Sequence, residues 1–305
     1  MMLPERLKKG DMIGIITPSG PINTDKLKKA VPFFENMGLH VKLGEHIDQV
    51  NGYLAGTDHQ RLQDFHTMLA DDSVKAIIFA RGGYGAGRIV PSIDYSLVKN
   101  NPKIIWGYSD ITYLHTAIRQ KTGLITFHGP MAVSDIAKDG FDELSAKLFK
   151  QLFQPVELIY TEKISPLDVL VPGEGEGELV GGNLSLIAST LGTPYEIDTK
   201  DKLLLLEDIG EEPYRLDSML NQLKLAGKLE EAAGIIIGDF AETESNLKTT
   251  LTVSQVFSDY FEDLPCPVVS GFKIGHCFPH FSVPLGAKGQ LQAKDKTLKI
   301  APGVK

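Results

Sequence analysis

Short apolar runs alternate with helical patterns over the first half of the chain. Met12–Thr17 and Val74–Ala80 are continuous apolar runs, typical of strands in a parallel sheet that is covered on both faces. An amphipathic helix is predicted between them, over Asp58–Leu69. The other predicted elements of this half are a helix from about Asp25 to Met37, strands at Val41–Leu43 and Leu124–Phe127, and a helix at Phe141–Phe153. This alternation predicts an α/β fold with a doubly wound sheet, whose ligands bind at the carboxyl ends of its strands.

The pattern changes near residue 165. Ser165–Gly177 is rich in Pro, Gly and Glu, which is typical of a linker. Beyond it, the amphipathic helix Tyr214–Ala226 separates two apolar runs, Lys202–Leu206 and Gly234–Gly238, which predict buried strands. Gly286–Ile300 alternates like a hairpin. We therefore expect two domains, residues 1–165 and 166–305.

The composition is that of a globular protein and argues against several kinds of partner. The 305 residues are 42% hydrophobic and 23% charged, as in an ordinary globular protein. A net charge of −8 argues against nucleic acid or an anionic membrane as a partner, since either needs a basic face. No apolar run has the length of a signal-peptide core or a membrane span. With two cysteines only, too few for a disulfide framework, a bacterial cytoplasmic location is expected.

Ser109 lies where a predicted strand ends and a helix begins. Lys103–Trp106 is a short apolar run, and apolar residues recur at helical spacing through Asp110–Gln120. A serine at such a corner presents its hydroxyl above the sheet edge, beside N–H groups that can stabilise an oxyanion. The usual elbow has a second glycine two residues after the serine, where this chain has Ile111. The alternative interpretation is a serine that only caps the helix.

Four glycines follow the strand Val74–Ala80, in the segment Arg81–Arg88. Their spacing is not that of a dinucleotide loop, and no phosphate-binding lysine follows them. A second interpretation is a nest of backbone N–H groups for an oxyanion or a carboxylate beside Ser109. A plain turn between strand and helix is the third.

A carboxylate and a histidine complete the candidate chemistry. Glu207 and Asp208 end an apolar strand, and either could orient a histidine, although both could also belong to an acidic loop before a helix. His276 follows a short strand-like segment and a glycine, and His128 is the rival base. A base within reach is what makes a serine hydroxyl nucleophilic. Serine, acid and histidine thus occur in that order, and we expect them to form one acyl-transfer centre.

A metal centre is not indicated. Cys277 and His280 lie beside His276, but their spacing is not that of a zinc site. We expect neither a metal nor a cofactor.

At these residues the chain resembles the LD-carboxypeptidase family of serine peptidases, which act on muropeptides. The resemblance spans nearly the whole chain and is closest to the cytoplasmic muropeptide carboxypeptidases of Gram-positive bacteria. The motifs that carry it are Gly14-Ile15-Ile16-Thr17-Pro18-Ser19, Arg81-Gly82-Gly83-Tyr84-Gly85, Gly107-Tyr108-Ser109-Asp110-Ile111-Thr112, Phe127-His128-Gly129-Pro130, Gly181-Gly182-Asn183-Leu184, Leu206-Glu207-Asp208 and Gly275-His276.

The resemblance implies a catalytic role for five of these residues. Ser109 would be the nucleophile, His276 the base and Glu207 the orienting acid, with the backbone N–H groups of Gly83 and Asp110 as oxyanion donors. It implies a Rossmann-like (flavodoxin-like) N-terminal domain, a smaller β-rich α/β C-terminal domain, and a homodimer. The reaction implied is hydrolysis of the L–D peptide bond that releases terminal D-alanine from the tetrapeptide stem, in cell-wall recycling.

Substrate contacts are expected from the glycine loop and from one helix. An exopeptidase needs a cation or an N–H cluster for the free carboxylate, and Arg81 and Arg215 are the candidates. The alternative for both arginines is a surface ion pair. Gly82 and Tyr84 are expected to contact substrate as well. Ser218 stands where relatives often have arginine, which bears on local substrate or dimer contacts.

Two other functions fit the same residues. One is a resistance peptidase of the same family that hydrolyses peptide–nucleotide antibiotics, for which Trp106 and Tyr84 would be a sparse aromatic platform. The other is a non-catalytic two-lobed ligand-binding protein. Whether the third stem residue is lysine or diaminopimelate is open.

Overall fold

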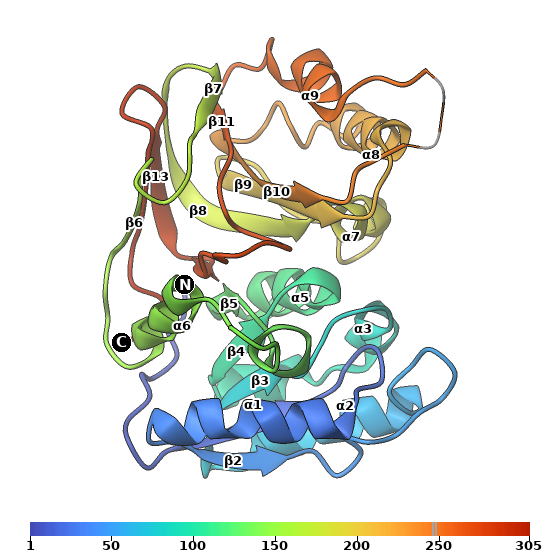
Figure 1. Cartoon of the computed structure of the whole chain (residues 1–305), viewed down its shortest axis with the longest axis vertical. Coiled ribbons are helices and arrows are strands. Elements are labelled where there is room, and N and C mark those ends of the chain that lie inside the picture. The colour runs from blue at the N-terminus through green and yellow to red at the C-terminus, as the bar shows by residue number, and fades with distance from the viewer. Residues whose placement is uncertain (246, 248) are drawn as a thin grey trace. The chain divides into compact units, whose positions relative to one another are not determined.

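The computed structural model of this protein describes residues 1–245, 247 and 249–305. Two compact units make up the chain (Figure 1). The first unit contains Met1–Val156 with two short later segments, Ser282–Gly286 and Pro302–Lys305, and the second contains Glu157–Phe281 and Ala287–Ala301. The two domains expected from the sequence, 1–165 and 166–305, stay a prediction, because a compact unit need not be a part that folds alone.

A six-stranded sheet forms the middle of the first unit. Its strands are β1 (Met12–Ile16), β2 (His40–Leu43), β3 (Val74–Phe79), β4 (Ile104–Gly107), β5 (Thr126–His128) and β12 (Val283–Leu285). They lie in the order β12-β5-β4-β3-β1-β2, and all pairs from β5 to β2 are parallel. The edge strand β12 pairs antiparallel with β5. The order 2-1-3-4-5 is that of flavodoxin-like doubly wound sheets, so the predicted α/β fold is confirmed.

Helices cover both faces of this sheet. They are α1 (Thr24–Asn36), α2 (Asp58–Ala70), α3 (Ala86–Ile89), α4 (Tyr95–Asn100), α5 (Thr112–Thr122) and α6 (Glu143–Leu148). Helix α4 contacts both α2 and α5, so these three form one layer, whereas α1 contacts the turn Ala132–Ile136. The right-handed rule for β-α-β crossovers places α1 on the opposite face, because β2 lies on the other side of β1 from β3. Burial on both faces explains why the strands are continuous apolar runs.

Local signals in the sequence set the helix starts. Thr57 and Gln60 form a capping box at the start of α2, each side chain bonding to the backbone of the other residue. Asn23 caps α1 by accepting hydrogen bonds from the next amides. The predicted helix over Phe141–Phe153 is α6 followed by a 3₁₀ turn at Phe149–Leu152.

The second unit is built on an eight-stranded mixed sheet in the order β6-β14-β13-β8-β9-β10-β11-β7. These strands are β6 (Leu158–Tyr160), β7 (Asp168–Val171), β8 (Glu174–Asn183), β9 (Leu203–Ile209), β10 (Gly234–Ala241), β11 (Val268–Ser270), β13 (Lys288–Gln292) and β14 (Thr297–Ile300). The run from β8 to β11 is parallel, and the outer pairs are antiparallel. β13 and β14 form the hairpin that the sequence predicts near the end of the chain.

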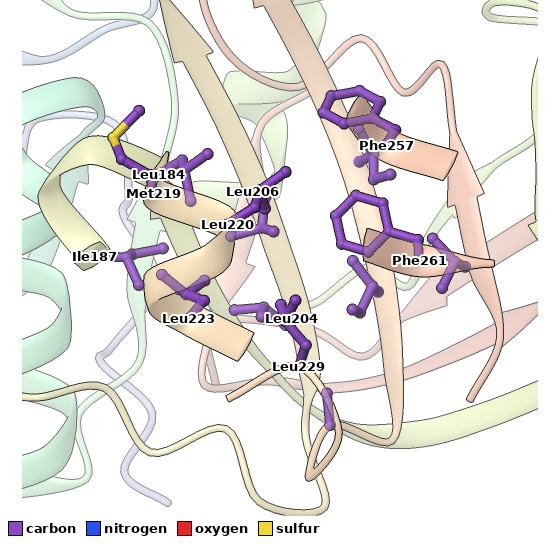
Figure 2. Packing of buried hydrophobic residues seen from close by; sticks show 14 of the residues in the cluster. Leu184, Ile187, Leu204, Leu206, Met219, Leu220, Leu223, Leu229, Phe257 and Phe261 are labelled. Atoms are coloured by element: carbon purple, nitrogen blue, oxygen red, sulfur yellow. The ribbon is translucent and has the colours of Figure 1, made fainter. Parts of the chain in front are cut away.

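Three helices bury the apolar face of the parallel strands. They are α7 (Leu184–Thr190), α8 (Pro213–Leu225) and α9 (Val253–Phe261). Figure 2 shows Leu220 and Leu223 of α8 directed toward Leu204 and Leu206 of β9, with Phe261 of α9 on the neighbouring part of the same core. The five residues just named are fully buried. This core fixes β9, the strand that carries Glu207.

The prediction of a linker at Ser165–Gly177 is wrong. This segment contains β7 and the first residues of β8. The glycines of β8 are needed for close approach, because a Cβ at Gly175 would lie 2.3 Å from the carbonyl oxygen of Ala233, and one at Gly177 would lie 2.6 Å from that of Asp201. Alternating Glu and Gly here therefore mark a strand inside the sheet, with one face against backbone, and not a flexible segment.

Candidate active site

Ser109 occupies a sharp turn between β4 and α5. A 3₁₀ turn, Ser109–Ile111, joins the end of the strand to the helix. The φ of Ser109 is 63°, in the left-handed region that residues other than glycine rarely adopt. Such strain is held by the surrounding fold and is frequent at functional residues. Ile111, in place of the elbow's second glycine, is completely buried and anchors the turn in the core.

The glycine loop after β3 lies against Ser109. A Cβ built on Gly82 would be 3.1 Å from Ser109 Oγ and 3.4 Å from the amide nitrogen of Asp110, so only glycine allows this approach without a shift. Gly83, the next residue, has a φ of 114°. The structure thus brings Gly82 close to Ser109 and Asp110, whereas a Cβ on Gly83 would face Gly20, 3.6 Å from its Cα. The oxyanion nest of the second interpretation stays a prediction.

A pocket of about 650 Å³ opens beside this loop within the first unit. It is lined by Gly20, Pro21, Tyr53, Arg81, Gly83 and Tyr84. These residues follow β1, β2 and β3, so the pocket lies near the switch point between β1 and β3, where flavodoxin-like sheets bind ligands. One guanidinium nitrogen of Arg81 donates to the carbonyl oxygen of Pro21 at 3.1 Å, which directs this side chain along the pocket wall.

Tyr53 is a lining residue that the sequence did not single out. Its ring makes an edge contact with Tyr84, with 5.7 Å between ring centroids. Both residues are more than half exposed, Tyr53 at 68% and Tyr84 at 55%. No local pattern in the sequence marks Tyr53. Trp106, by contrast, is fully buried and donates to the carbonyl oxygen of Pro130, so it offers no platform to a ligand.

In the second unit, His276 and Glu207 are in contact. His276 Nδ1 lies 2.8 Å from Glu207 Oε2, and the carboxylate accepts. The glutamate side chain is completely buried, while 13% of the imidazole is exposed. A Cβ at Gly275 would lie 2.7 Å from the same oxygen, which explains the glycine before the histidine. This pairing fixes the imidazole tautomer with its proton on Nδ1 and leaves Nε2 as the basic nitrogen.

Asp208, the other candidate acid, has a structural role. Successive side chains of β9 face opposite sides of the sheet, so Glu207 and Asp208 point apart. Asp208 accepts hydrogen bonds from the Asn183 side chain at 2.9 Å and from the amide and hydroxyl of Ser185 at 2.8 and 2.6 Å. Burial raises the pKa of this carboxyl, and the bonds from Ser185 oppose that change. Asp208 therefore anchors the start of α7.

The remaining candidates lie in other settings. His128, the rival base, is fully buried in β5 with its ring 5.5 Å from that of Tyr108. Arg215 lies on α8, where its half-exposed side chain is 3.3 Å from Glu211. Ser218 lies on the exposed face of the same helix.

The described ranges 1–245, 247 and 249–305 contain no group of three His, Cys, Asp or Glu side chains arranged to hold a metal ion. Within those same ranges, no helix is both long enough and apolar enough to span a bilayer.

Comparison with known proteins places the whole chain in one family. Residues 13–129 match the LD-carboxypeptidase N-terminal domain, and residues 176–291 match the LD-carboxypeptidase C-terminal domain. The chain is 54% identical over 302 residues to the probable murein peptide carboxypeptidase of Bacillus subtilis strain 168, covering 99% of this chain and 95% of that protein.

Solved structures agree with this placement. The muramoyltetrapeptide carboxypeptidase from Oxalobacter formigenes has a TM-score of 0.86 and 28% identity, covering 96% of this chain and 100% of that one. The microcin C7 self immunity protein MccF, in complex with aspartyl sulfamoyl adenosine, has a TM-score of 0.92 and 24% identity and covers 100% of both chains, a likeness of fold alone. The chain therefore belongs to the LD-carboxypeptidase family of serine peptidases.

Proposed function

We propose that this protein is a serine LD-carboxypeptidase that releases terminal D-alanine from muropeptide tetrapeptides. The observation that carries the proposal is the strained Ser109 turn against Gly82, in a chain 54% identical to a probable murein peptide carboxypeptidase. The contact between His276 and Glu207 supports it, because it supplies an oriented base of the kind that activates a serine.

Each of these groups has a defined part in the proposed mechanism. Nε2 of His276 removes the hydroxyl proton as Ser109 Oγ attacks the carbonyl carbon of the L–D bond, and the buried Glu207 carboxylate stabilises the imidazolium. The N–H groups of Gly83 and Asp110 stabilise the tetrahedral oxyanion. The imidazolium then gives its proton to the amine of the leaving D-alanine. Water, activated by the same histidine, hydrolyses the acyl-enzyme and regenerates the serine.

The pocket beside the glycine loop is proposed to hold the carboxylate-bearing end of the substrate. Arg81 is the charged residue that lines it, and a guanidinium matches a carboxylate in charge and geometry. Gly82 and Tyr84 of the same loop are proposed to contact the substrate beside it, together with Tyr53. Arg215, which already pairs with Glu211, is proposed to contribute less.

Replacing Arg81 with methionine is expected to raise KM for the tetrapeptide by about 10- to 100-fold, the range that corresponds to losing one hydrogen bond to a charged group. Methionine keeps most of the side-chain volume and removes the charge. Arg215→Met is the comparison, and its KM is expected to change less. Steady-state kinetics of both variants checks the assignment, and a larger effect at Arg215 would transfer the role to that residue.

The experiment that tests the function is mass spectrometry of a defined tetrapeptide after incubation with the protein. Loss of one D-alanine fixes both the bond and the direction of cleavage. Lysine and diaminopimelate substrates, run in parallel, show which stem residue is preferred. An unchanged tetrapeptide, with cleavage of an acyl-sulfamoyl adenosine, would favour the resistance peptidase instead.

The binding-protein alternative is tested by a serine-directed phosphonate small enough to enter the site. Labelling of Ser109 would reject a purely binding role. A cytoplasmic location and a homodimer, which the family resemblance implies, complete the proposal. Sedimentation of the purified protein and fractionation of the source cells test these two points.

A further inference from the structure

Arg61 of α2 is a buried arginine outside the proposed catalytic groups. Only 1% of the residue is exposed. Its guanidinium donates to the carbonyl oxygens of Pro18, in the loop after β1, and of Gly85, in the glycine loop after β3, the latter at 2.8 Å. It also pairs with Asp58 at the start of its own helix. One side chain thus ties together both loops that flank the switch point of the sheet.

The peptide group between Gly85 and Ala86 is held from both sides. Its carbonyl oxygen accepts from Arg61 Nη1 at 2.8 Å, and its N–H donates to Asp110 Oδ2, also at 2.8 Å. A cation on the oxygen and a carboxylate on the N–H both make charge-assisted hydrogen bonds, the stronger kind. Rotation of this peptide would break both bonds at once. We call this arrangement the peptide clamp.

The glycine loop needs such a clamp. Gly83 and Gly85 both have positive φ, and a loop rich in glycine loses much conformational freedom when it is ordered. Gly82, three residues before the clamped peptide, lies so close to Ser109 that a Cβ built on it would be 3.1 Å from Ser109 Oγ. Burial lowers the pKa of Arg61 and raises that of Asp110, so keeping both groups charged here costs free energy. The two groups attract each other across the clamped peptide, which offsets part of this cost.

We propose that the side chains of Arg61 and Asp110 are positioning residues, which hold the glycine loop so that its N–H groups face the oxyanion formed at Ser109. The proposal rests on the proposed function. It gives Asp110 two tasks, because its backbone N–H is one proposed donor while its carboxylate orients the loop that carries the other. Arg61 acts through the loop and touches no substrate.

The test compares Arg61→Met with Arg88→Met. Arg88 also pairs with Asp58, but within the described part of the chain its side chain donates to no loop carbonyl. We expect Arg61→Met to lower kcat for D-alanine release by about 10²-fold, the loss that a misplacement of about 1 Å causes, with KM near that of wild type. Arg88→Met should keep the wild-type kcat.

Four further variants separate a positioning role from a role in folding. Arg61→Lys keeps the charge but loses the fork of donors, so its kcat should lie between those of wild type and Arg61→Met. In Arg61→Ala, millimolar guanidinium should restore part of the lost kcat, while ammonium at equal ionic strength should not. Asp110→Asn, whose amide oxygen can still accept from Ala86, should lose less than Asp110→Ala.

Equal kcat values in Arg61→Met and Arg88→Met would overturn the proposal that the clamp positions the loop. A change in KM alone, or a loss that neither lysine nor guanidinium relieves, would overturn it too. The rate at which a serine-directed phosphonate labels Ser109, measured in each variant, keeps this test separate from the function. If wild type releases no D-alanine, the proposed function fails, and slower labelling in Arg61→Met than in Arg88→Met still supports the clamp.

Discussion

Ser109→Ala is expected to abolish release of D-alanine, lowering kcat by about 10⁶-fold, as loss of the nucleophile does in other serine peptidases. No other hydroxyl can take over, because attack requires an oxygen at the strained turn beside the glycine loop. Alanine at this position bears the same unfavourable φ as serine, so the thermal midpoint should stay near that of wild type. Product analysis by mass spectrometry, with thermal unfolding of the same sample, checks both statements.

Ser109→Gly is the matched control for strain. Glycine adopts the observed φ of 63° freely, so this variant should be as inactive as Ser109→Ala but should have a higher Tm. A higher Tm without activity would show that the turn conformation is costly and is kept for the hydroxyl. Turnover retained in either variant would refute the serine assignment.

Glu207→Gln should lower kcat by about 10⁴-fold, as replacement of a triad acid by its amide does. The amide matches the carboxylate in size but can donate to Nδ1 of His276, which favours the wrong imidazole tautomer. It also removes the negative charge that stabilises the imidazolium in the transition state. Because Glu207 is completely buried, solvent cannot replace that charge. Steady-state kinetics with the tetrapeptide measures the effect.

Asp208→Asn is the control for Glu207→Gln. It changes the adjacent carboxylate on the opposite face of β9, where the hydrogen bonds to Ser185 anchor α7. We expect a lower Tm with kcat close to wild type. The reverse outcome, an unchanged rate in Glu207→Gln and a collapsed rate in Asp208→Asn, would move the orienting role to Asp208.

The parallel strands of the first sheet could be predicted well from the sequence, because strands buried on both faces leave continuous apolar runs. Val74–Ala80 and the run before Ser109 are such strands, and both occur as expected. The segment Ser165–Gly177 could not be predicted in the same way. Its glycines mark close backbone approach to residues that are distant in the chain, and a composition rule cannot distinguish this from flexibility.

Some features of the candidate site could likewise be predicted from the sequence, and others could not. Ser109 and the glycine loop are local features of two strand ends, so their contact follows from the sheet topology. The alternation of β9 implies that Glu207 and Asp208 face apart, but the position of His276 is what distinguishes them. Tyr53 and Arg61 carried no local signal, because each acts through contacts with loops that only the folded sheet brings near.

Ser282–Gly286 belongs to the first unit although it lies late in the chain, which limits how this protein could be truncated. That segment contains β12, which pairs with β5 along one margin of the six-stranded sheet. A fragment that stopped at residue 156 would lack this strand, and the backbone groups of β5 that face it would be left open to other chains. Such a truncation therefore invites self-association, and an excised N-terminal half needs a grafted copy of residues 282–286 to keep that margin closed.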